Sequence, residues 1–475
     1  MRQTEKERLH DLDNYVMNYI PIHLVRLSDM ALVSREDVRE HFKARFLQSD
    51  GPPSETVKYA TLSHRWGQGE PTYATFEEMK KSARKTPGLE KLMNFCEKAK
   101  ECGAEFAWSD TCCIDKSSSA ELDESIRSMF KWYRNSHVCI VYLAQSETIE
   151  DVLHDEWMER GWTLQELLAP IRIKFFNKRW IAITRNNNDK DHSKMMDTLN
   201  RATGIPHGDL RRFNNISPSN VDKRMTWAAK RKTTRVEDVA YSLMGIFRVS
   251  MQIAYGEGGD SAFGRLIEAI MQAGDPSVLN WKGESASYCN YSRAIPQSPR
   301  CFVGDGLLSY RGQLEMTMTS LGLRVPLVML PLNFHSFYLS GDKEILKFEC
   351  SLCPALKINI KSPYNPGYGH TFKEPGRHYA VGIVNYSLIG DGSREVLKIS
   401  GKSAGFILMK SVDDTPPDPP SRPASCVGLR FVSPPQRELC PWEAIEGGLV
   451  EVKFPKINSN DIFYIGREYL ETVYI

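Results

Sequence analysis

The spacing of apolar positions predicts alternating strands and helices in the first third of the chain. Apolar residues recur at helical spacing among the charged residues 4–20, which predicts an amphipathic helix. A short strand is expected at 22–27. Residues 34–55 are polar and end in a Gly-Pro-Pro-Ser turn or loop. We treat residues 1–55 as an N-terminal helix and extension.

The next segment, residues 56–185, has the pattern of an α/β domain. Strands are expected at 57–63, 105–108 and 138–143, the last as a continuous apolar run typical of a strand covered on both faces. Apolar residues 89–99 form one helix face, and a second helix follows Ser118 and Glu121, which have capping-box spacing. This alternation predicts a parallel sheet, whose ligands bind beyond the carboxyl ends of the strands. Loops 63–70, 109–119 and 144–162 therefore become the candidate ligand loops.

The pattern changes twice further along the chain. Residues 186–290 are mainly helical by periodicity, with helices expected at 195–203, 223–230, 237–247 and 262–272. Residues 300–475 alternate short β-branched or aromatic runs with turn signals, which predicts a C-terminal β-rich domain, a sandwich or a barrel. Its strands are expected at 323–330, 346–350, 379–385, 396–399, 405–409, 427–432, 449–454 and 462–466, with a Pro-rich loop at 415–423.

Composition narrows the class of protein. The 475 residues are 41% hydrophobic and 25% charged, with a formal net charge of +2, which is ordinary globular usage. Acidic neighbours offset the basic run 230–232, so we expect no nucleic acid partner. No export signal or membrane span is expected, and the 11 cysteines are then expected to be reduced in a cytoplasmic protein.

Three blocks carry a resemblance to a known family. They are Tyr-Ala-Thr-Leu-Ser-His-Arg-Trp-Gly at 59–67, Trp-Ser-Asp-Thr-Cys-Cys-Ile-Asp-Lys-Ser at 108–117, and Arg-Gly-Trp-Thr-Leu-Gln-Glu-Leu-Leu-Ala-Pro at 160–170. In order and spacing they resemble the HET domain of fungal heterokaryon-incompatibility proteins. The segments 233–247 and 255–258 fit the same pattern, so the resemblance covers about residues 22–285.

The resemblance implies a role in fungal allorecognition, an innate immunity that ends in programmed cell death. HET domains are regarded as distant relatives of the TIR domain, so a TIR-like (flavodoxin-like) fold is implied for residues 56–185. The partner would be a second copy, as a homo-oligomer, or another incompatibility protein. Larger members add an NTPase and repeats. Here Gly-Lys-Ser at 401–403 lacks the first P-loop glycine, because position 396 is Val, so we expect no ATP-driven switch.

The third block implies a catalytic residue. Trp162-Thr-Leu-Gln-Glu166-Leu resembles the Trp-Cys-x-x-Glu-Leu signature of TIR domains, in which the glutamate of active members serves NAD cleavage. A carboxylate can stabilise the positive charge that develops on the ribose, and because nicotinamide leaves from a cationic ring, one carboxylate can suffice. In the alternative interpretation, Glu166 only solvates its helix or pairs with Arg160.

We expect an NAD pocket around Glu166, formed by Ser63, Arg65, Trp66, Asp110 and Trp162, because residues 63–67 and Asp110 follow strands at the ligand edge of the sheet. Arg65 could clamp a pyrophosphate through its planar guanidinium, and Trp66 could stack on a base. Asp110 follows a strand, where it could hold a ribose hydroxyl or cap a turn. Trp66 could equally anchor the core.

Other chemistries have less support. Cys112 or Cys113 beside His64 or His137 permits a cysteine-hydrolase alternative, which requires a base within hydrogen-bond reach. No metal is expected, because the Cys-x-x-Cys pair at 350–353 has no second pair at finger spacing. The main alternative to an NAD hydrolase is a non-enzymatic module that self-associates or docks a partner.

Overall fold

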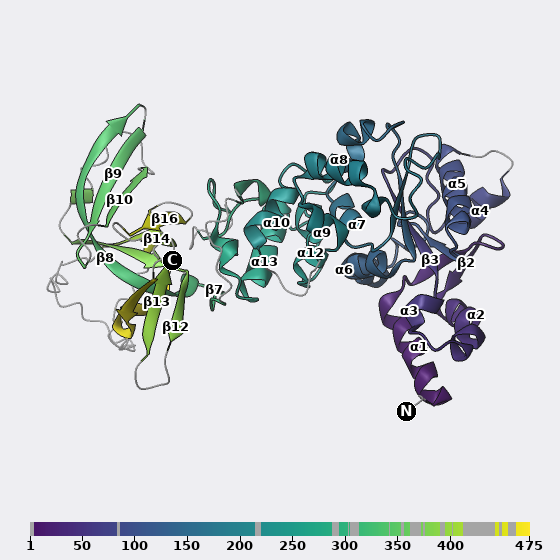
Figure 1. Cartoon of the computed structure of the whole chain (residues 1–475), viewed down its shortest axis with the longest axis horizontal. Coiled ribbons are helices and arrows are strands. Elements are labelled where there is room, and N and C mark those ends of the chain that lie inside the picture. Colours follow the sequence, from purple (N-terminus) through teal and green to yellow (C-terminus); the bar gives the residue numbers. More distant parts are fainter. Residues whose placement is uncertain are drawn as a thin grey trace, which may run out of the picture. The chain divides into compact units, whose positions relative to one another are not determined.

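The computed structural model describes residues 4–82, 86–213, 220–286, 294–302, 304, 313–341, 343–352, 356–361, 372–373, 376–389, 395–400, 402–411, 442–445, 449–454 and 462–475. The chain divides into two compact units. Unit 1 comprises Met1–Pro218 and Thr226–Leu266, and unit 2 comprises Ser219–Met225 and Ile267–Ile475. Figure 1 shows the elements of both.

Unit 1 begins with a helical extension. Helix α1 (Glu5–Tyr19) starts in a capping box between Thr4 and Glu7. A hairpin of β1 (His23–Arg26) and β2 (Ala31–Ser34) follows, then α2 (Arg35–Gln48) and α3 (Pro53–Thr56). Helix α2 lies in the polar stretch 34–55, where no helix is predicted. Its buried side chains are only three, spaced four residues apart, which makes its apolar face narrow: Val38, Phe42 and Phe46.

A six-stranded sheet forms the centre of unit 1, in the order β2-β1-β4-β3-β5-β6. Strands β3 (Tyr59–His64), β4 (Phe106–Trp108), β5 (Val138–Tyr142) and β6 (Ile173–Phe176) are parallel, and β1 joins β4 antiparallel. Numbered by chain order, the parallel strands run 2-1-3-4, the order that opens the flavodoxin-like doubly wound sheet. The predicted parallel α/β sheet is confirmed, β1 matches the short strand expected at 22–27, and β2 and β6 are added.

Helices cover this sheet. In Figure 1, α4 (Phe76–Lys81) and α5 (Pro87–Glu101) lie on one side of it, and α6 (Ser119–Asn135) and α7 (Thr163–Leu168) on the other. The expected capping box of α6 forms only in part. Ser118 Oγ accepts from Glu121 N at 3.3 Å, whereas the Glu121 carboxylate accepts from Asp115 N at 2.8 Å and contacts His23.

The helical region consists of short elements. They are α8 (Ser193–Thr203), α9 (His207–Arg211), α10 (Val221–Ala228), α11 (Asp238–Tyr241), α12 (Met244–Phe247) and α13 (Gly259–Met271). The helix predicted at 237–247 is therefore two helices. Short 3-10 turns occur at Asp151–His154, Glu156–Glu159, Asp189–Asp191, Pro276–Leu279, Pro299–Cys301 and Arg467–Tyr469.

Unit 2 is β-rich, as predicted, and contains a nine-stranded, nearly closed, barrel-like sheet. Its longest strand is β8 (Gly322–Ser340), which pairs with β7 (Thr317–Thr319), β9 (Lys343–Cys350), β11 (Arg377–Ile383) and β18 (Leu470–Tyr474). Strand β9 pairs with β10 (Lys357–Lys361), and β11 with β14 (Lys402–Ser411), which also pairs with β15 (Glu443–Ala444) and β16 (Val450–Lys453).

A second, three-stranded sheet completes unit 2. It comprises β12 (Tyr386–Ile389), β13 (Val396–Ser400) and β17 (Ile462–Gly466). The strand predicted at 427–432 and the loop predicted at 415–423 lie outside the described residues.

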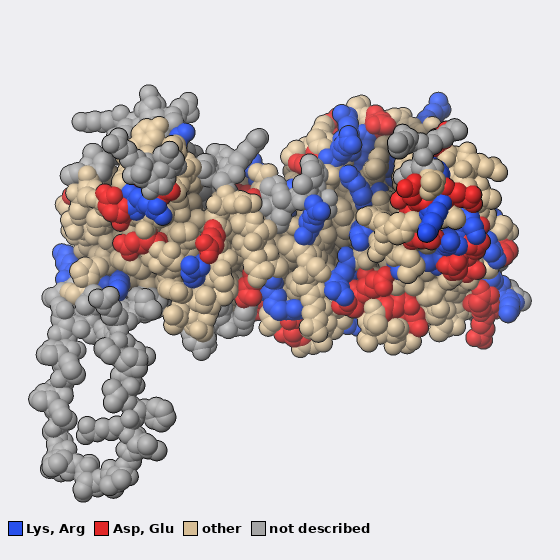
Figure 2. All heavy atoms as spheres, turned by 90° about the horizontal axis from the view of Figure 1, so that it is seen from below, with Lys and Arg blue, Asp and Glu red and all other residues tan. Residues whose placement is uncertain are grey.

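The charged residues on the surface are mixed in sign (Figure 2), as the near-neutral net charge of the chain leads one to expect. On the face shown in Figure 2, basic and acidic residues are interspersed. Among the helices that the structure describes, none combines the length and the apolar character that a membrane crossing requires.

Candidate functional site

Three loops that follow strands meet at the carboxyl edge of the parallel sheet. Ser63 lies near the end of β3, Asp110 lies two residues beyond β4, and Glu166 lies in α7, between β5 and β6. Ser63 Oγ donates to Glu166 Oε2 at 2.5 Å, and Trp66 Nε1 donates to Asp110 Oδ2 at 2.9 Å. These contacts bring the end of β3, the loop after β4 and helix α7 together beside the switch point between β3 and β5, and Glu166 lies just beyond the predicted loop 144–162.

Glu166 is enclosed in a hydrogen-bond network. Its residue is 6% exposed, while Ser63 and Trp157 are 0% and 1% exposed. Trp157 Nε1 donates to Ser63 Oγ at 2.8 Å, and the Tyr133 hydroxyl is the other polar neighbour of the Glu166 carboxyl. Tyr133 is itself fixed by donating to the Leu62 carbonyl at 2.8 Å. The carboxyl position is thus determined by groups from β3, α6 and the loop after β5.

The same enclosure perturbs the charge of Glu166. Burial raises the pKa of its carboxyl to about 8, and the nearby Asp110 carboxyl raises it too, against the lowering effects of Ser63, Arg160 and Tyr133. At neutral pH the folded protein therefore holds Glu166 mostly protonated. A cation placed against this carboxyl would drive its ionisation.

Asp110 and Trp66 form the outer part of the site. Burial raises the pKa of Asp110, while the Lys116 charge and the Trp66 hydrogen bond lower it. Trp66 is 47% exposed, and Lys116 Nζ lies 4.0 Å from the centre of its ring. The indole is thus not a core anchor, and Lys116 already covers one face of its ring.

Arg65 and His64 face different surroundings. The Arg65 guanidinium forms an ion pair with Glu156, and both side chains are about half exposed. His64 is buried, and burial pushes the pKa of its ring well below the ordinary value. Its Nε2 lies 3.7 Å from Glu70 Oε1, too far for a hydrogen bond. Arg65 therefore reaches an anionic ligand only by leaving Glu156.

Trp162 is engaged with a later segment of unit 1. Its indole is a hydrogen-bond partner of Asp238, which also accepts from the Tyr255 hydroxyl at 2.9 Å. The half-buried Arg231 lies nearby and donates through Nη1 to the Arg160 carbonyl at 2.8 Å and to Thr163 Oγ1 at 2.9 Å. These contacts tie the Glu166 segment to segments 226–231 and 238–255.

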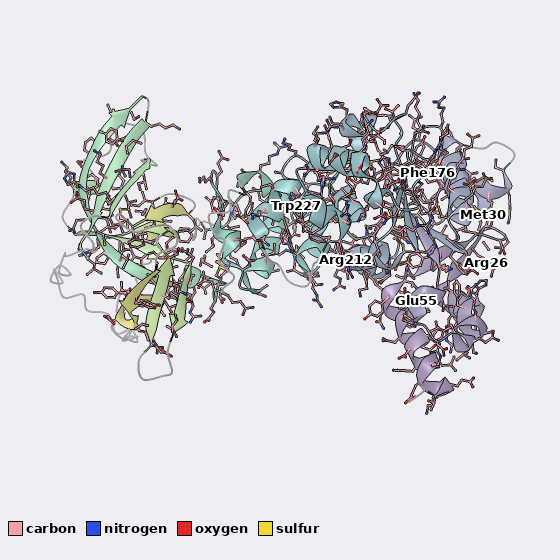
Figure 3. All side chains as sticks on the ribbon, viewed as in Figure 1. Arg26, Met30, Glu55, Phe176, Arg212 and Trp227 are labelled. Atoms are coloured by element: carbon pink, nitrogen blue, oxygen red, sulfur yellow. The ribbon has the colours of Figure 1, made fainter. Side chains whose placement is uncertain are left out.

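Arg231 is not part of a surface patch. Its Nε donates to the carbonyl of Trp227 at 3.2 Å, a residue labelled in Figure 3. Burial lowers the pKa of Arg231 to about 10. Its neighbour Lys232 pairs with Glu159 at 2.8 Å. Within the basic run 230–232, Arg231 therefore bonds backbone carbonyls and Lys232 forms an ion pair.

Several buried polar atoms on these elements have no hydrogen-bond partner within the described residues. They are both ring nitrogens of His64, Nε2 of Gln165 and Nη2 of Arg231. Buried polar groups are paired in the great majority of native structures. The unpartnered atoms of His64 and Gln165 lie on the same elements as Ser63 and Glu166.

The cysteine alternative fits the structure poorly. Cys112 and Cys113 are buried, with their sulfur atoms 3.8 Å apart, and this contact and burial raise the pKa of the Cys112 thiol well above the ordinary value. His137 Nε2 lies 3.2 Å from the Cys102 carbonyl instead. A nucleophilic cysteine needs a lowered pKa and some exposure. The structure also groups no three potential metal ligands within its described part.

Comparison with known proteins finds a matching domain family. Residues 59–151 match the family described as Heterokaryon incompatibility protein (HET). The chain is also 39% identical over 253 residues to the vegetative incompatibility protein HET-E-1 of Podospora anserina. The chain contains a HET domain. The aligned region is 51% of this chain but only 18% of that relative, and no solved structure matches.

The family match covers part of the candidate site. Ser63, Arg65, Trp66 and Asp110 fall within the matched HET range, whereas Trp162 and Glu166 lie beyond residue 151. The structure joins the two groups directly through the hydrogen bond between Ser63 and Glu166. The candidate site thus joins residues inside the matched range to residues of α7 beyond it.

Sequence analysis did not predict several members of the HET site. Tyr133 comes from the apolar face of α6, Trp157 from a 3-10 turn, and Lys116 from the loop after β4. Arg231 comes from the run interpreted as a solvated basic cluster. Lys116 even lies inside the second family block, but residue type alone does not indicate which way a side chain points.

Proposed function

We propose that this chain acts in heterokaryon incompatibility, as an allorecognition protein whose HET domain triggers cell death. The HET match and the similarity to a vegetative incompatibility protein support this proposal. The partner that triggers it would be a second copy of the chain or another incompatibility protein.

We further propose that the HET domain is TIR-like and hydrolyses NAD at Glu166. The observation that carries this proposal is the buried Glu166 carboxyl, hydrogen-bonded by Ser63 at the carboxyl edge of a 2-1-3-4 parallel sheet. Its pKa of about 8 suits a group that is neutral without ligand and ionises when the cationic nicotinamide ring arrives. The family resemblance assigns the same residue.

In this proposal, the main contribution of the protein to the reaction is the negative charge of the ionised Glu166 carboxylate. The bond between the ribose carbon and the pyridinium nitrogen breaks, its electron pair neutralises the ring, and nicotinamide leaves. The ionised Glu166 stabilises the resulting oxocarbenium ion. Water then adds to the same carbon and loses a proton, so that NAD and water give ADP-ribose, nicotinamide and one proton.

The neighbouring groups fit the rest of the substrate. Lys116 and Arg160 act electrostatically on Asp110 and would attract the pyrophosphate. The half-exposed Trp66 offers a ring face for a base. Arg65 would join them after releasing Glu156. Trp162, whose indole is engaged by Asp238, would position the Glu166 segment rather than contact substrate.

The test is nicotinamide release by the purified full chain at high concentration, with Glu166→Gln and a matched Glu159→Gln control. Glu159 is exposed, pairs with Lys232, and ends the 3-10 turn that precedes α7. We expect turnover by the wild type and by Glu159→Gln, and a loss of about 100-fold or more in Glu166→Gln. The kcat/KM should rise with pH toward about 8, because it reports the pKa of the free enzyme.

One observation favours a second candidate function, a non-enzymatic association module. Ser63, Trp157 and Glu166 are almost fully enclosed, as a network that only stabilises the fold would be. This alternative expects concentrated, folded and self-associating protein to consume no NAD. Retained turnover in a folded Glu166→Gln protein would also remove Glu166 from the proposal.

A further inference from the structure

Helix α7, which carries Glu166, is too short to hold its position alone. It has six residues, Thr163–Leu168, and no side chain caps its first turn. Isolated helices shorter than about 12 residues are marginal in water, so such a helix depends on tertiary contacts. All six of its residues are buried. The place of the Glu166 carboxyl is therefore set by the segments that contact α7.

The backbone just before α7 is bonded to a segment much further along the chain. Lys232 N donates to the Glu159 carbonyl at 2.6 Å, and Gly161 N donates to the Lys232 carbonyl at 2.8 Å. Arg160 and Lys232 thereby form a parallel bridge. Gly161 lies so close to Thr233 that an added Cβ would enter the Thr233 side chain. The chain thus enters α7 along residues 231–233.

The half-buried guanidinium of Arg231 adds a contact at the same end of α7. Its Nη1 donates to the Arg160 carbonyl at 2.8 Å and to Thr163 Oγ1 at 2.9 Å, and its Nε donates to the Trp227 carbonyl at 3.2 Å. Thr163 and Glu166 are three residues apart, so they lie on the same face of the helix. The charges of Arg231 and Glu166 also attract each other. Arg231 therefore holds the first turn of the helix on the face that carries Glu166.

The Asp238 carboxyl holds the residue that precedes α7. It is a hydrogen-bond partner of the Trp162 indole, and it accepts from the Tyr255 hydroxyl at 2.9 Å. Its neighbour Glu237 accepts from Gly256 N at 2.9 Å, which ties the loop that carries Tyr255 to the start of α11. These residues belong to the segments 233–247 and 255–258, which fit the HET pattern. The contacts give both segments a role at the N-terminal end of α7.

We propose that Arg231 and Asp238 are positioning residues of the candidate site, which act through α7 on Glu166. Arg231 fixes the first turn of the helix, and Asp238, with Tyr255, fixes Trp162 at its N-cap. Misplacing a catalytic group by about 1 Å can cost roughly 100-fold in rate, so contacts remote from the substrate can matter. The kinetic consequence rests on the proposed NAD hydrolysis, whereas the placement of Glu166 does not.

The first experiment measures nicotinamide release by the full chain with Asp238→Asn or Arg231→Gln. We expect kcat and kcat/KM to fall together by about tenfold or more, with KM changed by less than about threefold, because Glu166 acts in the transition state. Lys232→Gln is the control for Arg231→Gln. Its side chain is exposed and pairs with Glu159, so kcat should stay within about twofold of the wild type.

A pair of tyrosines separates positioning from general loss of stability. Tyr255→Phe removes the hydroxyl that donates to Asp238, and it should lower kcat about threefold or more. Tyr241→Phe makes the same chemical change, but its hydroxyl donates to Glu257 at 2.6 Å, so kcat should be unchanged. Circular dichroism shows whether each variant is folded. Tyr255→Phe is the mildest change and keeps the test possible if Arg231→Gln does not fold.

The second experiment needs no turnover. Burial raises the pKa of Glu166 to about 8, so the effect of Glu166→Gln on the free energy of unfolding depends on pH between 5 and 8. A Glu166 carboxyl displaced by Asp238→Asn would gain water and titrate nearer its ordinary pKa. The pH dependence of Glu166→Gln should then shrink by at least about half in the Asp238→Asn background. The other titratable or charged groups that interact with Glu166 are the same in both backgrounds: Asp110, Tyr133, Cys139, Arg160 and Arg231.

The outcomes separate this inference from the proposed function. If the wild type releases no nicotinamide but the pH dependence shrinks in the Asp238→Asn background, NAD hydrolysis is wrong and the positioning of Glu166 stands. If the wild type is active but the variants keep kcat, or lose rate only through KM, the inference is wrong and the hydrolysis stands. An unchanged pH dependence in the Asp238→Asn background shows that other contacts hold α7, and it overturns the inference in either case.

Discussion

Replacing Glu166 by Gln should raise the free energy of unfolding of unit 1, and the difference from wild type should grow with pH. The carboxyl has a pKa of about 8 in the folded protein and about 4.5 in an unfolded chain. Between these values the folded state holds a proton that the unfolded state releases. Stability therefore falls as pH rises from about 4.5 to about 8, and it is constant above that range.

The magnitude follows from the size of the shift. Each pH unit inside this window costs about 1.4 kcal/mol, so the cost at pH 7 is roughly 3 kcal/mol relative to pH 4.5. Glutamine has nearly the same shape as glutamate but does not ionise in this pH range. Its side-chain carbonyl can still accept the hydrogen bond from the Ser63 hydroxyl. The advantage of Glu166→Gln over wild type should thus rise by about 1.4 kcal/mol per pH unit from pH 5 to pH 8.

Urea unfolding at pH 5, 6, 7 and 8 measures this difference. Seven of the nine tryptophans lie in unit 1, at positions 66, 108, 132, 157, 162, 180 and 227, so indole fluorescence reports mainly on that unit. Subtracting the wild-type free energy at each pH removes the other titrating groups. Glu159→Gln, an exposed carboxylate paired with Lys232, is the control and should show little pH dependence.

The result that would refute this reasoning is a difference that stays constant or falls with pH. A falling difference would show that Glu166 is ionised in the folded protein and stabilised as a carboxylate. The burial argument for a neutral group would then be wrong, and with it the proposed response to a cationic ligand.

Two further predictions concern packing and hydrogen bonding around the site. Ser63→Ala removes the acceptor of Trp157 Nε1 and should cost about 1–3 kcal/mol in urea unfolding, with no loss indicating that the indole finds another partner. Gly161→Ala would drive a methyl group into the side chain of Thr233 and should cost about 1–3 kcal/mol. Gly208→Ala, with no atom within 4 Å of the added carbon, should change stability by less than about 1 kcal/mol, so equal effects would contradict the crowding at Gly161.

Much of the fold was predictable because periodicity is a local signal. The continuous apolar run 138–143 corresponds to β5, and the helical spacing of residues 89–99 to α5. Helix α2 was missed because its apolar face is narrow. The helix predicted at 237–247 is broken in the structure, a detail that an averaged periodicity does not resolve.

The candidate site was predictable only as a set of loops. The family blocks contain Ser63, Asp110 and Glu166. Because the carboxyl ends of parallel strands lie at the same edge of a sheet, the segments that follow these strands are expected to meet there. The partners Tyr133 and Trp157 were not predictable, since an aromatic residue on an apolar face has the same pattern whether or not it bonds a carboxyl.

The amino-acid sequence by itself determined the α/β and β-rich parts of this protein and its HET domain, because periodicity and motifs are properties of neighbouring residues. Only the tertiary structure decided that Glu166 meets Ser63, that it keeps its proton, and that Arg231 points inward. The reason is physical. Burial, and the charges that act on a buried group, come from residues as much as 103 positions apart in the chain.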